Sequence, residues 1–480
     1  MSRVSTGMIW SFFERFSTQG IGFVLSVIIA RIVAPEVYGL IAIVQVFISF
    51  AQVFIDSGFG NALIQKKYRT DDDFYTVFIF NLVVSAILYI IFFFCAPLIS
   101  DFYNEPRLTQ ITRLVSLTLL ISAFCIVQRT KLTIQLDFKR QAVASFSATL
   151  ISGAVGVIMA YRGFGVWALV TQQLIMQIVQ AIVLAIVSKW RPRFVFDLDS
   201  FKQMFSFGSK LLVNNLITSV YINIANIFIG KWYSPASLAF YNRGFTLSQI
   251  ISTNIEGVLQ RIIYPITCEA QDDKEKLIKC YQKYLHLSHF IILPILTMMC
   301  ILATPLISVL LTDSWLPAAE YVVLFCINFM FYAWTDQSGS LTNAIGRSDM
   351  NLKGTFIKRP IAFLLLFISL GKGVKAICIA TIISSIIELI VNIGICNKVI
   401  GMKVWEHIKP QLDLFCVNIL MGIIVYLVSL LFCSMKLKLF ISGIIGGIVY
   451  IILSFIFKLP ERRLILFLFN RSTSAISNVR

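Results

Sequence analysis

The sequence predicts an all-α protein that crosses a membrane many times. Of its 480 residues, 58% are hydrophobic and only 14% are charged, and the mean hydropathy is +0.83. A soluble chain of this length needs far more polar residues to cover its surface. Apolar runs of about 18 residues or more recur along the chain, and each is long enough to cross a bilayer as a helix. Because helices satisfy their own backbone hydrogen bonds inside lipid, these runs predict a bundle of spanning helices.

The candidate spans are joined by connections of no more than about 20 residues. Such connections leave no room for a soluble catalytic domain, so we expect the function to reside within the bundle. The first span is too long for the apolar part of a signal peptide, and it carries Glu14, Arg15 and Gln19. About fourteen spans are predicted, at residues 7–30, 36–57, 74–98, 109–128, 141–161, 165–188, 203–230, 235–263, 282–311, 317–345, 355–370, 374–397, 411–433 and 437–457.

The distribution of Lys and Arg predicts the orientation. With fourteen spans, one side of the membrane holds both termini and 28 of the 41 basic residues, the other side holds 9, and 4 lie within spans. Positive residues concentrate on the cytoplasmic side, so both termini are expected in the cytoplasm. The net charge of +17 follows largely from this topology and from attraction to anionic lipid head groups. It gives no reason to expect nucleic acid as a partner.

An internal repeat divides the chain. Four short matches occur in the same order in two parts of the sequence, at an offset of 200 residues near the start and 208 further on. They predict two six-span halves of equal orientation, related by a pseudo-two-fold axis along the membrane normal, with the substrate site at the interface between the halves. The matched positions are 30–35 with 230–235, 56 with 256, 96–100 with 304–308, and 163–168 with 371–376. The predicted parts are an N-lobe at 1–190, a C-lobe at 200–398, two extra helices at 411–457 and a cytoplasmic tail at 458–480.

Polar side chains form stripes on several spans. Facing lipid, a charged group costs several kcal/mol, so these stripes should face protein or water. At about 100° per residue, the span at 235–263 carries two of them. They are Asn242, Gln249, Thr253, Glu256 and Gln260 on one face, and Arg243, Asn254 and Arg261 on another. Further stripes are Ser11, Glu14, Thr18 and Gly22 with Arg15 and Gln19; Gln45, Ser49, Gln52 and Asp56; Gln172 or Gln173, Gln177 and Gln180; and Asn215, Ser219, Asn223 and Asn226 with Lys210 and Asn214.

Four motifs carry a resemblance to a known family. They are ARIVAPEVYGLIAI (30–43), DSGFGNALIQ (56–65), CAPLISDFY (95–103) and GFGVWALV (163–170). These motifs resemble the Wzx-type polysaccharide-transporter branch of the multidrug/oligosaccharidyl-lipid/polysaccharide exporter superfamily, nearest to exporters for colanic or teichuronic acid. The likeness covers nearly the whole chain, and its first 200 residues are the more specific part.

The resemblance implies two six-helix lobes facing each other in a V, plus two extra helices. It implies a flippase that moves undecaprenyl-pyrophosphate-linked oligosaccharide repeat units from the cytoplasmic to the periplasmic leaflet by alternating access, for O-antigen, capsule or exopolysaccharide export. Such a protein is a secondary transporter of the bacterial inner (plasma) membrane, not an enzyme. The expected partners are the lipid-linked oligosaccharide, membrane lipids, H⁺ or Na⁺, and the polysaccharide polymerase and chain-length machinery.

This substrate class assigns roles to the intramembrane polar residues, because phosphate needs cations and sugar needs amides or aromatics. The candidates for pyrophosphate are Arg15, Lys210, Arg243 and Arg261. Those for the sugar are Gln19, Gln45, Gln52, Asn215, Asn223, Asn226, Asn242, Gln249 and Asn254. Those for ion coupling are Glu256, Asp56 and Glu14.

Each role has a structural alternative. Arg261 lies near the cytoplasmic end of its span and can instead extend to the lipid head groups. Glu14 can act as a local partner of Arg15, while Asp56 and Glu256 can be packing groups that burial leaves neutral. Asn and Gln stripes also hold neighbouring helices together.

Other functional classes are less well supported. Ten single cysteines and three histidines predict no metal site, no cofactor is expected, and no HExxH, Walker A or nucleophile-elbow motif is present. A cation-coupled multidrug exporter of the same superfamily is the main alternative, and the repeated motifs argue against it. A membrane polymerase or ligase of lipid-linked sugars is a weaker one, because the longest predicted outer loop is only 99–108.

Overall fold

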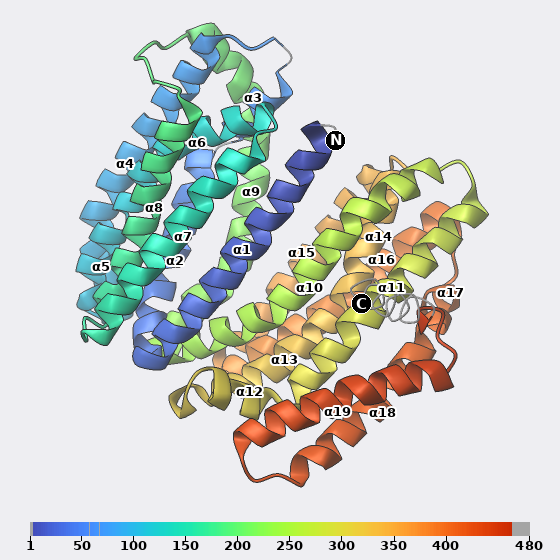
Figure 1. Ribbon diagram of the computed structural model, residues 1–480. Coiled ribbons are helices and arrows are strands. Elements are labelled where there is room, and N and C mark those ends of the chain that lie inside the picture. The colour runs from blue at the N-terminus through green and yellow to red at the C-terminus, as the bar shows by residue number, and fades with distance from the viewer. Residues whose placement is uncertain (1–2, 57, 67, 463–480) are drawn as a thin grey trace, which may run out of the picture. The chain divides into compact units, whose positions relative to one another are not determined.

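The structure is a computed structural model that describes residues 3–56, 58–66 and 68–462. Within these ranges all regular structure is helical and no strand occurs (Figure 1). The side chains of residues 3–9, 11–16, 206, 207, 210, 214, 262, 265 and 348 lie outside the described part, as does most of the predicted tail at 458–480. The predicted all-α fold class is confirmed.

Helix contacts divide the chain into two compact units, Met1–Ala239 and Phe240–Arg480. The predicted lobe limits at 190, 200 and 398 stay predictions. The first unit contains α1 (Arg3–Ile32), α2 (Pro35–Asp56), α3 (Phe59–Gln65), α4 (Asp71–Tyr103), α5 (Arg107–Val115), α6 (Leu117–Ile134), α7 (Phe138–Tyr161), α8 (Val166–Ser188), α9 (Leu198–Trp232) and the start of α10 (Pro235–Glu269).

The second unit continues from α10 and consists of helices separated by short turns. They are α11 (Lys274–Ile301), α12 (Ala303–Leu310), η1 (Asp313–Trp315), α13 (Ala318–Met330), α14 (Tyr332–Ala344), α15 (Ser348–Ser369), η2 (Leu370–Lys372), α16 (Val374–Ile400), α17 (Val404–Ile408), η3 (Lys409–Gln411), α18 (Leu412–Leu430) and α19 (Met435–Ile456).

Twelve helical stretches in the described part are long and apolar enough to cross a membrane. They correspond to twelve of the predicted spans, so the chain is a multi-pass membrane protein. The other two predicted spans, 7–30 and 235–263, fall on α1 and α10, which are helices of 30 and 35 residues. Of α1, only the shorter apolar stretch Ser17–Ile32 is apolar enough, and α10, a continuous helix that carries Arg243, Glu256 and Arg261, is not among the twelve. The predicted count of fourteen is therefore approximate.

Local sequence signals explain where several helices begin. Thr70 and Asp73 form a capping box that starts α4, and Asp137 accepts a hydrogen bond from a backbone N–H at the start of α7. Gly165 and Gly373 precede α8 and α16 with φ angles of 54° and 99°, which favour glycine. These two glycines are equivalent in the sequence repeat, so the repeat extends to local backbone structure.

The core of the first unit holds the chain between α8 and α9 in place. Trp190, in that connection, is only 6% exposed and packs against Tyr75 and Phe78 of α4, at ring-centroid distances of 5.8 and 5.6 Å. Phe59 of α3 joins the same cluster of buried residues. The short helix α3 and the start of α9 are therefore fixed to α4 by apolar packing.

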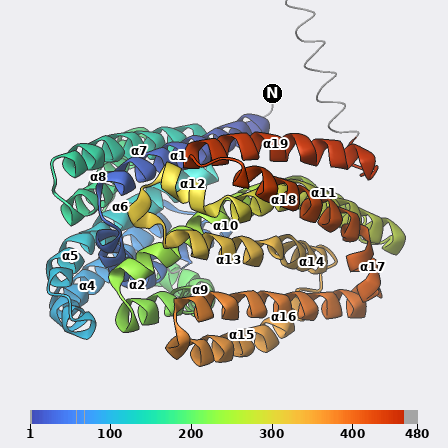
Figure 2. The same cartoon turned by 90° about the horizontal axis from the view of Figure 1, so that it is seen from below.

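In the second unit, α11 packs against α13, α14 and α18, while α15 pairs with α16 and α18 with α19 (Figures 1 and 2). The three histidines of the chain join α11 to the C-terminal segments by buried hydrogen bonds. These bonds link His286 with Glu461 at 2.9 Å, His289 with Gln411 at 3.0 Å, and His407 with Tyr281 at 3.2 Å. No group of His, Cys, Asp and Glu among the described residues could hold a metal ion.

One close backbone approach yields a prediction. A Cβ atom built on Gly39 of α2 would lie 1.8 Å from the carbonyl oxygen of Pro235, so even alanine requires the backbone to move. We expect Gly39→Ala to destabilise the protein by about 1–3 kcal/mol, measured as a lower melting temperature in detergent. Gly447→Ala, at a site with nothing within 4 Å, is the control. Equal melting temperatures of the two variants would contradict this packing.

Candidate functional site

The main candidate site is a cavity of about 980 Å³ within the first unit, which we call the N-terminal cavity. It lies between α2, α3, α6, α8 and α9, and most of its lining is polar. The polar lining residues are Gln45, Ser49, Gln52, Asp56, Asn61, Thr118, Ser122, Arg129, Thr130, Thr133, Gln173, Gln177, Gln180 and Asn215. No aromatic side chain is among its lining residues in the described part of the chain. The chemistry of the wall is therefore that of amides and hydroxyls.

Three of the predicted stripes meet in this cavity. The stripe on α2 faces the stripe on α8, and Asn215 adds the amide of α9. Their residues are spaced three or four apart, so each helix turns the same polar side toward the cavity while its other sides pack or face lipid. Of the predicted sugar contacts, the structure brings together Gln45, Gln52 and Asn215.

A short chain of hydrogen bonds orders the α2 side of the cavity. Gln52 donates through Nε2 to Asp56 Oδ1 at 3.2 Å, and its Oε1 accepts from the Ser122 hydroxyl of α6 at 3.3 Å. Both functions of the Gln52 amide are therefore used, which fixes its orientation. Gln45 and Asn215 are exposed to the open space. The wall thus combines a positioned amide with amides that can turn toward a ligand.

Arg129 and Asp56 are the two charged residues among the described residues that line the cavity. They come from α6 and α2, and they lie near enough for their charges to attract each other. Arg129 was missed as a site residue in the sequence, where it counts as a basic residue of a cytoplasmic connection. The available signal was the polar stripe Thr118, Ser122, Arg129 and Thr133, which follows the helical period along α6.

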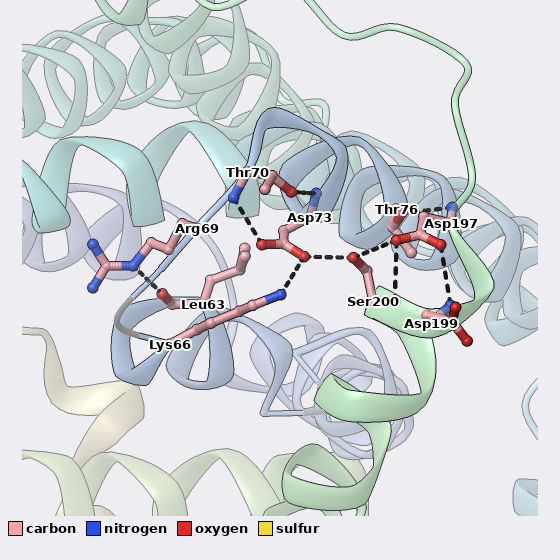
Figure 3. A network of polar contacts seen from close by, with 9 residues as sticks. All are labelled: Leu63, Lys66, Arg69, Thr70, Asp73, Thr76, Asp197, Asp199 and Ser200. Atoms are coloured by element: carbon pink, nitrogen blue, oxygen red, sulfur yellow. Dashed lines mark hydrogen bonds and ion pairs between the residues drawn. The ribbon is translucent and has the colours of Figure 1, made fainter.

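Polar contacts at one end of the unit hold the α3 wall (Figure 3). Asp73 of α4 is 0% exposed and binds Lys66 Nζ at 2.7 Å, while the Ser200 hydroxyl of α9 donates to it at 2.6 Å. Arg69 donates to the carbonyls of Leu63 and Ile64 at the end of α3, both at 2.6 Å. Together these contacts join α3, α4 and α9.

The Asp197 carboxyl extends the network to the α8–α9 connection. Its oxygens accept from the backbone N–H groups of Asp199 and Ser200, and its Oδ2 lies 2.7 Å from the Ser200 Oγ, so the Asp73 and Asp197 carboxylates share the single Ser200 proton. These hydrogen bonds hold the pKa of Asp197 below its usual range. The backbone N–H of Asp197 donates to the Thr76 hydroxyl of α4 at 3.0 Å. The start of α9 is thereby fixed against α4 on the side where Trp190 packs.

A second polar cluster lies inside the second unit. Glu256 of α10 is 1% exposed and accepts from Gln337 Nε2 of α14 at 3.0 Å. One turn further on, Gln260 donates to Asp336 Oδ2 at 2.9 Å. The Oε1 atom of Glu256 has no hydrogen-bond partner among the described residues. A carboxyl that is buried without a contacting cation keeps its charge only at a cost, so this is a chemically unusual position.

The remaining predicted residues are dispersed. Arg243 lies over the Trp315 ring at 5.1 Å, and Arg261 is exposed. The amides of Asn223 and Asn254 donate to the backbone carbonyls of Ser219 and Ile250, four residues earlier on the same helices. Gln19 is exposed, and Asn226, Asn242 and Gln249 are partly buried. The side chains of Glu14, Arg15 and Lys210 lie outside the described residues.

The fold has known counterparts. The lipid II flippase MurJ, in an inward closed conformation, superposes with a TM-score of 0.75 at 17% identity over 96% of this chain and 99% of MurJ. An inward-facing multidrug resistance MATE family transporter of the MOP superfamily superposes with a TM-score of 0.60 at 13% identity, over 82% and 95% of the two chains. The fold is that of this class of membrane transporters.

The family follows from the sequence. Residues 28–320, more than half of the chain, match the family described as polysaccharide biosynthesis protein, and the chain belongs to this family. Teichuronic acid biosynthesis protein TuaB of Bacillus subtilis is 24% identical over 84% of this chain and 85% of its own length. Lipopolysaccharide biosynthesis protein WzxC of Escherichia coli is 22% identical over 74% and 72%. The family predicted from the four motifs is confirmed.

The buried Asp73 carboxyl at the start of α4 yields a second prediction. Asp73→Asn removes the partner of Lys66 and weakens the bond from Ser200, so we expect a loss of about 2 kcal/mol in stability, measured as a lower melting temperature. Asp72→Asn, at the exposed neighbouring position, is the control and should melt as the wild type does. If Asp73→Asn melts no lower than this control, α3 is held by apolar packing alone.

Proposed function

We propose that the protein is a flippase for undecaprenyl-pyrophosphate-linked oligosaccharide repeat units in polysaccharide export. It acts as a secondary transporter in the bacterial inner membrane, with both termini in the cytoplasm, and moves the repeat unit from the cytoplasmic to the periplasmic leaflet. Membership of the polysaccharide biosynthesis family supports the pathway. The transporter fold supports movement rather than synthesis.

The observation that carries the proposal is the N-terminal cavity. Sugar hydroxyls donate and accept hydrogen bonds, as amides and hydroxyls do, and the cavity presents both from five helices. Its volume of about 980 Å³ is at the upper end of the range of small-molecule sites. A wall of this kind shelters a bulky hydroxylated group from hydrocarbon while leaving the lipid tail outside it.

The predicted site residues outside this cavity stay candidates for later contacts. We propose that Arg15, Lys210, Arg243 and Arg261 meet the pyrophosphate during alternating access. The amides of Gln19, Asn223, Asn226, Asn242, Gln249 and Asn254 are proposed to meet the sugar. The polysaccharide polymerase and chain-length machinery are the proposed partners that take the product.

Two other functions fit the cavity less well. A multidrug exporter handles amphipathic cations, which aromatic rings and carboxylates bind. The N-terminal cavity has one carboxylate and, among the described lining residues, no aromatic ring. A polymerase or ligase needs a catalytic segment outside the membrane, whereas the connections at residues 104–106 and 162–165 are turns of three and four residues.

We propose that Glu256 couples transport to a cation gradient, with Asp56 and Glu14 as further candidates. The Glu256 carboxyl is buried and accepts from the neutral amide of Gln337, and its Oε1 has no hydrogen-bond partner in the part of the chain that the structure describes. Binding H⁺ would remove the cost of a buried charge, and release of H⁺ would restore it. Such a group changes its interactions with Gln337 when the cation binds.

The flippase function predicts a specific cellular defect. Deleting the gene should cause lipid-linked repeat units to accumulate on the cytoplasmic leaflet, and the wild-type gene should restore export. A gene that carries Gln52→Leu should restore export to about one tenth of the wild-type level, because the substitution removes the amide held between Asp56 and Ser122. Gln271→Leu, on an exposed connection, is the control. Normal export in the deletion strain would refute the function.

The coupling role is tested in proteoliposomes with an imposed proton gradient. Glu256→Gln keeps the size of the side chain but cannot bind a proton, so we expect stimulation of transport by the gradient to disappear. Glu269→Gln, exposed at the end of the same helix, should retain it. Stimulation that persists in Glu256→Gln would move the coupling role to another group.

A further inference from the structure

A second, apolar hollow lies beside the N-terminal cavity. This apolar slot has a volume of about 220 Å³ and is formed by α2, α3, α4 and α9. Among the described residues, its lining contains one hydroxyl and otherwise only hydrocarbon side chains. The lining residues are Phe54, Phe59, Phe80, Val84, Phe205, Ser209 and Leu212. Phe54 and Phe205 are 39% and 45% exposed, so the slot is open to the surroundings of the unit.

The slot and the cavity share a wall. Residues 53–56 at the end of α2 and 58–60 at the start of α3 contribute to both: Phe54 and Phe59 line the slot, while Asp56 and Gly60 line the cavity. On its cavity side α3 lies close to α6, where a Cβ on Gly60 would approach the Thr130 hydroxyl to 3.1 Å. A hydrogen-bonding compartment and a hydrocarbon compartment therefore meet along one short stretch of chain.

Charge is placed at this shared wall. Asp56 belongs to it, and Arg129, which lines the same cavity, exerts an electrostatic attraction on Asp56. Arg129 is exposed to the open space of the cavity rather than buried in a packed interface. An arginine presents a planar set of donors that matches phosphate oxygens.

We propose that the shared wall binds the diphosphate junction of the substrate, with Arg129 on the diphosphate and the first isoprene units in the apolar slot. The inference rests on the proposed function and assigns a site within it. A lipid-linked sugar changes from hydrocarbon to diphosphate to hydroxylated sugar along its length, and the shared wall joins an apolar slot to a cavity that offers both Arg129 and amides.

The depth of the slot agrees with this occupant. Under the predicted orientation, the shared wall is at the cytoplasmic ends of α2 and α4, and Phe80 lies about two and a half turns into α4. The slot is then level with the cytoplasmic leaflet, where the substrate begins. A substrate bound there keeps its lipid tail in the cytoplasmic leaflet.

Binding to the full-length protein in phosphatidylcholine nanodiscs tests the assignment, with undecaprenyl pyrophosphate and inorganic pyrophosphate as probes. Arg129→Gln should weaken both probes about tenfold, because both carry the diphosphate. Val84→Phe fills the slot and should weaken undecaprenyl pyrophosphate about tenfold while leaving inorganic pyrophosphate unchanged. The controls are Arg191→Gln, at an exposed position outside the cavity, and Val83→Phe, on the exposed side of the same helix turn.

The outcomes separate the site from the function. The assignment is overturned if Arg129→Gln binds both probes with wild-type affinity. It is also overturned if Val84→Phe weakens the binding of both probes equally. In either case the flippase function stands. If the wild-type protein does not bind undecaprenyl pyrophosphate more tightly than inorganic pyrophosphate, the proposed substrate itself is wrong. Equal melting temperatures of the variants and their controls exclude misfolding as the cause of a loss.

Discussion

A bilayer offers polar side chains no hydrogen bonds, and this constraint organises both units. Each amide or charge on a spanning helix must meet protein or enclosed water. On α2, Leu40 and Val44 are fully buried, while Gln45 and Gln52 turn to the N-terminal cavity. The same division on α6, α8 and α9 brings their polar sides to one place. The cavity is thus a direct consequence of polar residues that lipid excludes.

The second unit meets the same constraint by pairing its polar groups. Lys358 binds Glu388 at 3.1 Å and Asn392 at 3.0 Å between α15 and α16, and the histidines tie α11 to the C-terminal helices. The contrast is clearest at the repeat-equivalent carboxyls. Asp56 is exposed at the cavity wall, whereas Glu256 is 1% exposed and held by an amide. Equivalent positions in the two repeats therefore differ: the carboxyl lines the candidate site in the first repeat and is buried in the second. This difference fits the proposed division between substrate binding and ion coupling.

Periodicity alone predicted much of the fold and part of the site. Apolar runs indicated the spanning helices, and residues three or four apart indicated that Gln45 and Gln52 share a face. What periodicity cannot supply is the partner of a side chain. Arg243 lies over Trp315, a contact that depends on how α10 packs on a segment about 70 residues away. The sequence indicated only that Arg129 marks the cytoplasmic side of the membrane. A basic residue at the end of a spanning helix fits that role whether or not a cavity opens beside it.

The position of Arg129 also bears on how tightly a transporter should hold its cargo. Several arginines around a diphosphate would bind it strongly in every conformation of the transporter. A ligand that binds all conformations with equal affinity does not change their relative populations. In the N-terminal cavity a single arginine faces a carboxylate, Asp56, among the described lining residues. If the diphosphate binds Arg129 as we propose, that carboxylate would attract Arg129 in the empty cavity and repel the bound diphosphate. Such an arrangement gives recognition with modest affinity, so the substrate can leave once the conformation changes.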